Sequence, residues 1–320
     1  MKKLLTVSLI FILSSIFAQS KFSAKVFFDY SYQKDKTPTN SFEIHRAYFT
    51  FKNNLTKNIS YKFTTDVGRF NTGKDTRLSV YLKNALIKWK SEFGTFVFGL
   101  QGLNVFSVQE KNWGYRFIEK SAMDKNKFAS SADLGIGYSN KIGKKLNISL
   151  IVSNGTGYKK AENDNYKKIS AQVYYGSSKL NDKNSFNLGA VFSNESFDYS
   201  NGLATTTEAK TLLGLFGAVR LNKFKIGAEF DSYKTGGANI TATIISAYTN
   251  ISLTKKADAF ARVDLFDPNT DADNDGNTYF VAGFNLKPAK GLFIAPNIRV
   301  TKPQTGDSVT EYKLSFQFKL

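Results

Sequence analysis

The chain has 320 residues, 42% of them hydrophobic, and carries 44 Lys and Arg against 26 Asp and Glu, a formal net charge of +18. It contains no Cys, which excludes disulfides, thiolate metal sites and a lipid anchor on an N-terminal Cys. The basic residues are spread along the chain, which argues against nucleic-acid binding and favours a charged lumen or rim.

The N-terminus has the form of a secretory signal peptide. Met1-Lys2-Lys3 precedes an apolar run over residues 4–17, and Ala18-Gln19-Ser20 follows it. The run is shorter than the ~20 apolar residues that a spanning helix needs, and Thr and Ser interrupt it. We predict a signal peptide over residues 1–18, with residues 19–320 forming a single domain.

After this leader, sixteen segments alternate in the two-residue period of β-strands between turn signals. They cover residues 21–33, 41–53, 57–69, 77–90, 93–101, 132–141, 145–154, 166–176, 184–194, 208–221, 223–233, 240–253, 257–267, 277–286, 290–300 and 308–320. Single-chain bacterial barrels have an even number of strands. The sequence therefore predicts an all-β fold, a transmembrane antiparallel barrel of about 16 strands.

The connections between these segments alternate in length. Those near residues 91, 143, 221 and 255 are short, whereas most of the others are longer. Barrels have short periplasmic turns and long outer loops. This pattern makes residues 102–131 the third outer loop and the longest connection. A soluble β-sandwich or solenoid would share the strand alternation but not this asymmetry.

The last segment carries apolar or aromatic side chains at every second place up to Leu320. Chains that end in this way resemble bacterial outer-membrane β-barrels, whose last strand is the recognition signal for the barrel-assembly machinery. In that family the final residue is usually Phe or Trp, so Leu320 is a mild departure. The resemblance implies the outer membrane of a Gram-negative bacterium, with its lipid and lipopolysaccharide around the barrel.

Three segments resemble the phosphate-selective porin O and P family. They are Phe42-Glu43-Ile44-His45-Arg46-Ala47-Tyr48, Leu82-Lys83-Asn84-Ala85, and Tyr115-Arg116-Phe117-Ile118-Glu119-Lys120-Ser121 followed by Asp133-Leu134-Gly135. The chain departs from the family pattern with Asn84 for Asp, Lys120 for Arg and Ala132 for Arg. The resemblance implies a porin with a third loop inside the barrel and a homotrimer, and it suggests phosphate as a solute.

Basic residues that alternation places on the inner face, or that lie in the third loop, are the candidate pore-lining and anion-binding residues. They are Lys25, Arg46, Lys62, Arg116, Lys120, Arg262, Arg299 and Lys313. Fixed positive charge in a narrow aqueous pore attracts anions and repels cations. In the alternative, these residues only pair with nearby acids. Those acids are Glu43, Asp66, Glu110, Glu119, Asp258 and Asp264.

The seventh outer loop contains Asp271, Asp273 and Asp275 before a Gly, which resembles a calcium-binding loop. The twelfth position of that motif is Ala282, so the bidentate Glu is missing and the predicted Ca²⁺ site is weak. No other cofactor is expected. The prediction is a non-enzymatic outer-membrane porin for small hydrophilic solutes, with a preference for anions. A plugged, ligand-specific or structural barrel, or a barrel hydrolase using His45, are the alternatives.

Overall fold

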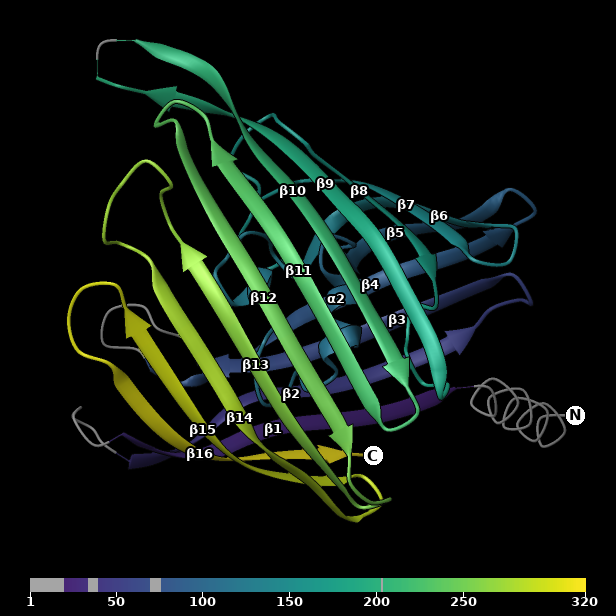
Figure 1. Cartoon of the computed structure of the whole chain (residues 1–320). Helices are drawn as coiled ribbons and strands as arrows, with labels where there is room; N and C mark the ends of the chain where they lie inside the picture. The colour runs from purple at the N-terminus through teal and green to yellow at the C-terminus, as the bar shows by residue number, and fades with distance from the viewer. Residues whose placement is uncertain (1–19, 34–39, 70–75, 203) are drawn as a thin grey trace, which may run out of the picture.

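The computed structural model describes residues 20–33, 40–69, 76–202 and 204–320, so the predicted signal peptide lies outside the described residues. Most of the described chain forms antiparallel strands (Figure 1). The strands are β1 (Lys21–Gln33), β2 (Asn40–Asn54), β3 (Ile59–Arg69), β4 (Leu78–Ser91), β5 (Gly94–Gly102), β6 (Ala132–Ile142), β7 (Leu146–Ser153), β8 (Lys168–Gly176), β9 (Asn184–Ser200), β10 (Thr205–Leu221), β11 (Phe224–Thr235), β12 (Ile240–Ser252), β13 (Ala257–Asp267), β14 (Asn277–Ala289), β15 (Leu292–Pro303) and β16 (Val309–Lys319). Two short helices, α2 (Ser107–Trp113) and α3 (Ala122–Lys125), lie between β5 and β6.

The sheet closes into a barrel because β1 pairs with β16. Lys25 lies opposite Lys319 and Gln33 opposite Glu311, so the start of β1 and the end of β16 lie at the same end of the barrel. We call this the turn end, because the short connections 92–93, 222–223 and 290–291 are there, and we call the opposite end the loop end. Closure leaves no strand edge unpaired, as a barrel in hydrocarbon requires.

The predicted count of sixteen strands is confirmed, and most bounds differ from the prediction by a few residues. The largest difference is in β9 and β10, which continue as a paired hairpin to Ser200 and Thr205. This hairpin projects past the neighbouring strands at the loop end (Figure 1). In its outer part the face that carries Phe192 continues with Asn194, Ser196 and Asp198, while Phe197 and Tyr199 lie on the opposite face, so the lipid-facing apolar alternation stops before the strands do.

The two faces of the barrel differ in polarity as predicted. Large apolar side chains are exposed on the outer face, including Phe22, Leu150, Leu188 and Leu215. Buried polar side chains such as Ser246 lie on the inner face. An outward apolar band around a polar interior is the arrangement of a barrel in a lipid bilayer. None of the described helices is long and apolar enough to cross a membrane.

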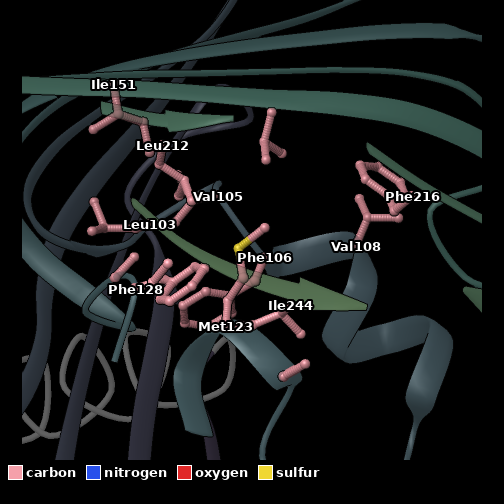
Figure 2. Close-up of a cluster of buried hydrophobic side chains, with 14 residues drawn as sticks. Leu103, Val105, Phe106, Val108, Met123, Phe128, Ile151, Leu212, Phe216 and Ile244 are labelled. Carbon is pink, nitrogen blue, oxygen red and sulfur yellow. The ribbon is translucent and has the colours of Figure 1, made fainter. Parts of the chain in front are cut away.

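The third loop (residues 103–131) folds into the barrel, and the hydrophobic core of the protein lies where this loop meets the wall. Figure 2 shows one cluster, in which Val105 and Met123 of the loop approach Leu212 and Ile244 of the wall. All four side chains are essentially inaccessible to solvent. Gly214 makes this approach possible, because a Cβ there would lie 2.8 Å from the Met123 methyl carbon.

A second cluster surrounds Trp113, at the end of α2, where only 1% of the residue is exposed. Its ring stands edge-on to Phe260 at a centroid distance of 5.9 Å and an interplanar angle of 87°. Phe117 and Ile118 of the loop pack in the same cluster. The wall residues of both clusters lie on β1, β7, β9, β10 and β12 to β15. The loop therefore covers one side of the lumen and leaves the wall of β2 to β5 open.

The buried tryptophan gives the first prediction. Trp113→Ala is expected to lower the free energy of unfolding by about 3–5 kcal/mol, because it leaves a cavity between loop and wall. Urea unfolding of the refolded protein in detergent measures this loss. The matched control is Trp89→Ala, because Trp89 is 44% exposed on the outer face and should cost less. Equal losses in the two variants would show that the loop does not pack against the wall.

Candidate pore constriction

Two buried arginines of the wall hold the tip of the third loop by its main chain. Arg262 forms a two-pronged ion pair with Asp264, at 2.7 and 2.6 Å, and also donates to the carbonyl of Lys120. Arg299 donates to the carbonyl of Ile118 at 2.6 Å. A loop inside a barrel has few waters to satisfy its carbonyls, so these charged donors stabilise its position.

Glu119 completes this attachment from the loop side. Its carboxylate accepts from the Tyr279 hydroxyl at 2.8 Å and pairs with Arg299 at 3.4 Å. Burial disfavours the charged carboxylate, but the nearby charges of Arg299 and Arg262 outweigh burial and lower the pKa of Glu119 from 4.5 to about 2. Glu119 therefore stays ionised throughout the physiological range.

Arg262 and Arg299 lie on the inner face, where the alternation places them, but they are 2% and 9% exposed. Both are paired beneath the loop, with Asp264 and Glu119. This is the arrangement that the alternative prediction described. Arg299 also lines the cavity at the loop tip, but both guanidinium groups bind loop carbonyls, and their role is to hold the loop.

On the open wall, a β-bulge in β2 turns two neighbouring side chains into the lumen. The pairing with β1 shifts at this point, since Phe27 faces Arg46 and Phe28 faces Ile44. His45 consequently reaches Asp29 at 2.8 Å, while Arg46 pairs with Asp66 at 2.9 Å. This bulge lies within residues 42–48, the first of the three segments that resemble the phosphate-selective porin family.

A second bulge, in β4, lies within residues 82–85, the second segment that resembles the phosphate-selective porin family. Thr64 pairs with Asn84 and Thr65 with Leu82, so Lys83 is the extra residue. Both Lys83 and Asn84 face inward as a result. The Lys83 amine donates to the Ser131 hydroxyl and lies 3.7 Å above the ring of Tyr158.

Alternation alone does not identify Lys83 as a pore-lining residue, nor Lys159, which lies 4.5 Å above the ring of Tyr81. Strict alternation assigns one of two adjacent residues to each face, so it cannot place Lys83 and Asn84 together inside. The available signal is the pair of adjacent polar residues between Leu82 and Ala85, where a lipid-facing residue was due. A polar pair of this kind within an apolar alternation indicates a bulge.

Across the gap from this wall, the loop presents a compact group of charges. The Arg116 guanidinium pairs with Glu110 at 2.8 Å and with Asp124 at 2.9 Å. Lys120 lies 4.0 Å from Asp124, at the limit of an ion pair. A cavity of about 250 Å³ separates the loop tip from the wall and is lined by Arg46, Arg116 and Lys120 among others.

The remaining predicted residues lie on the wall on either side of this cavity. Lys313 lines it and pairs with Asp29 at 3.1 Å and with Glu311 at 3.3 Å. Lys25 is on β1 and Lys62 on β3, and neither forms an ion pair with an acid in the described part of the chain. The Lys62 amine donates to Asn84 at 2.6 Å instead.

Toward the turn end, the open side of the lumen widens into a vestibule rich in lysine. Two of its cavities measure about 630 and 470 Å³. The residues with charge that line the smaller one are all lysines: Lys52, Lys62, Lys88 and Lys90. Lys111 and Lys141 line the larger one, with Glu92 as its acidic residue. The vestibule thus has a strong excess of positive charge.

The predicted calcium loop does not gather its carboxylates. Asp271, Asp273 and Asp275 are exposed, and within the described ranges no group of three or more His, Asp or Glu side chains is placed to hold a metal. Binding of Ca²⁺ to this loop stays a prediction.

The likeness of this chain to known proteins is one of architecture. No protein-family model and no curated protein matches the sequence. OprB of Pseudomonas putida has a similar structure, with a TM-score of 0.71 and 10% sequence identity over 96% of each chain. An anion-selective porin of Comamonas acidovorans matches with a TM-score of 0.64 and 13% identity, over 94% of this chain and 99% of that chain.

The trimer form of OmpT, an outer-membrane protein of Vibrio cholerae, matches with a TM-score of 0.66 and 14% identity, over 94% of this chain and 99% of that chain. At such identities the likeness concerns the fold. The class of protein is therefore a closed sixteen-stranded barrel of the kind found among outer-membrane porins. The narrower resemblance to phosphate-selective porins is not confirmed by these comparisons.

The attachment of the loop predicts a pH dependence. Glu119→Gln should lower the free energy of unfolding at pH 7 by about 3 kcal/mol, because it breaks a buried ion pair. The folded-state pKa of Glu119 is lowered from 4.5 to about 2, so its contribution is complete above pH 4.5 and disappears as the pH falls toward 2.

Urea unfolding in detergent at several pH values measures the difference between wild type and variant. That difference should stay constant from neutral pH down to about pH 5 and shrink below it. Glu92→Gln, in an exposed turn, serves as the control and should show no difference at any pH. A difference that already shrinks between pH 7 and 5 would contradict the attachment as described.

Proposed function

We propose that this chain is an outer-membrane porin of a Gram-negative bacterium, a passive channel for small hydrophilic solutes that prefers anions. The observation that carries the proposal is the charge around the gap between loop and wall. Five basic side chains line the cavity there against two acidic ones. The basic residues are Arg46, Arg116, Lys120, Arg299 and Lys313, and the acids are Asp29 and Glu119.

Fixed positive charge in a narrow aqueous passage raises the local concentration of anions and repels cations. The lysine-rich vestibule extends the same sign of charge toward the turn end. The likeness of fold to an anion-selective porin supports the proposal, although the identity of 13% is too low to transfer selectivity by itself.

Phosphate is the solute that we propose for test, on the strength of the resembling segments. Two of them form the bulges that bring Arg46 and Lys83 into the lumen, and the third forms the loop tip with Arg116. Arg offers a planar fork of donors that suits phosphate oxygens. Arg46 and Arg116 are both paired with acids, so an incoming phosphate has to compete with carboxylates for them.

The proposed location also implies partners. The exposed apolar outer face would contact outer-membrane lipid and lipopolysaccharide, and the final strand would be the signal for the barrel-assembly machinery. Assembly as a homotrimer is part of the proposal, and the trimer form of the similar Vibrio cholerae protein supports it.

A plugged barrel is the second candidate, because the third loop packs through two hydrophobic clusters and fills much of the lumen. The cavities on the open wall favour a channel instead. A hydrolase would need His45, which pairs with Asp29 at 2.8 Å. The described hydrogen bonds place no serine hydroxyl on His45, so the proposal remains a channel.

The test is the reversal potential of refolded protein in a planar bilayer across a KCl gradient, followed by a phosphate gradient. A steady conductance with an anion-selective potential is expected. A sealed barrel would show no steady conductance, and a cation-selective potential would refute the proposed preference.

Lys62→Glu sharpens this test. Reversing one charge about 8 Å from a passing ion changes their interaction by about 1 kcal/mol in water. Potassium is favoured by the same amount, so the permeability ratio of chloride to potassium changes by about 2 kcal/mol and should fall by about thirtyfold at low salt. The control is Lys255→Glu in the exposed turn between β12 and β13, which should leave the ratio nearly unchanged. Equal effects of both variants would show that surface charge, not the lumen, sets the ratio.

A further inference from the structure

We propose that Arg116 sustains the anion selectivity of the pore, because it masks the two carboxylates that the third loop turns toward the lumen. The inference rests on the proposed function and deepens it. It assigns Arg116 a role that differs from that of the other basic residues around the gap. Those residues add positive charge, whereas Arg116 keeps negative charge from acting.

The geometry of the group is specific. Nε of Arg116 lies 2.8 Å from Oε2 of Glu110, and one terminal nitrogen lies 2.9 Å from Oδ2 of Asp124. One planar guanidinium thus bridges an acid of α2 and an acid of α3. The three side chains are 19%, 33% and 13% exposed, so the group borders the aqueous gap.

Each masked acid has an unpaired lysine within electrostatic range on the opposite wall. The charges of Glu110 and Arg116 both act on Lys25. Those of Asp124 and Arg116 both act on Lys83. Within the described residues, neither lysine forms an ion pair with an acid. With Arg116 in place, the carboxylates pair with their own guanidinium, and the two lysines contact uncharged groups, such as the Ser131 hydroxyl and the Tyr158 ring beside Lys83.

Removal of Arg116 would take away the close partner of both carboxylates at once, and Asp124 would keep only the Lys120 ammonium at 4.0 Å. Each would then be available to the lysine across the gap, and two of the unpaired wall charges would be neutralised. The effect on selectivity should exceed that of losing one positive charge elsewhere on the loop. If selectivity follows only the sum of charges, every single loss of charge should count equally.

Arg116→Lys separates the two possibilities, because it keeps the charge and removes the bridge. Lys presents one ammonium group as a point charge and lacks the rigid fork that holds two carboxylates. If Arg116 acts by masking the two carboxylates, the chloride-to-potassium permeability ratio falls several-fold in this variant. If selectivity follows only the sum of the charges, the variant has the wild-type ratio.

Arg116→Gln and Lys120→Gln form the matched pair, since each removes one positive charge from the same loop. We expect Arg116→Gln to lower the ratio several-fold more than Lys120→Gln. Adding Glu110→Gln and Asp124→Asn to Arg116→Gln should restore a ratio at or above that of wild type, because no unmasked acid remains. The readout is again the reversal potential across a KCl gradient.

The outcomes are distinct. Two results with an anion-selective wild type overturn the inference that Arg116 masks the carboxylates and leave the proposed function intact. One is a wild-type permeability ratio in Arg116→Lys, and the other is an equal fall of the ratio in Arg116→Gln and Lys120→Gln. If Arg116→Gln fails to fold, Arg116→Lys alone decides between the accounts. A cation-selective wild type overturns the proposed function, and this inference with it.

Discussion

The hold of two wall arginines on the main chain of the third loop is the interaction on which the rest of the lumen depends. Arg262 and Arg299 donate to consecutive parts of the loop tip, at Lys120 and Ile118, and Glu119 binds back to the wall. Arginine keeps its charge at any physiological pH. The position of the tip therefore does not depend on a group that titrates near neutrality.

Once the tip is held there, the lumen has two unlike sides. On one side the loop packs against the wall through apolar clusters, and polar wall residues beneath it such as Ser246 and Asp264 bind each other. On the other side the wall of β2 to β5 remains exposed to the cavities. Basic residues near the loop attachment serve the fold, and those on the open wall are available to solutes.

The barrel was predictable from the sequence because a lipid-facing strand must alternate along its whole length. The period identified each strand, and the asymmetry of the connections identified residues 102–131 as a third loop. The packing of that loop was not predictable, since Val105, Val108 and Met123 follow no strand or helix period. They become recognisable as core only against Leu212 and the other wall residues that cover them.

The charged residues of the candidate constriction were likewise only partly predictable from the sequence. Alternation places Lys62 and Arg299 on the same inner face, but only the path of the loop decides that Arg299 is paired and Lys62 is not. Lys83 was not predicted for a different reason. A single inserted residue in β4 reverses the inward and outward faces on one side of the bulge. Sequence periodicity thus predicts the inner face, whereas the assignment of its charges requires tertiary structure.

The division of the lumen into a covered and an open side can be tested by chemical access in single channels. The chain has no cysteine, so Lys62→Cys on the open wall and Ser246→Cys beneath the loop each provide a unique thiol. Ser246 is inaccessible and bonded to Asp264 at 2.7 Å. A negatively charged thiol reagent should reduce the current through the first variant and leave the second unchanged. Equal modification and equal loss of current in both would contradict a loop fixed against the wall.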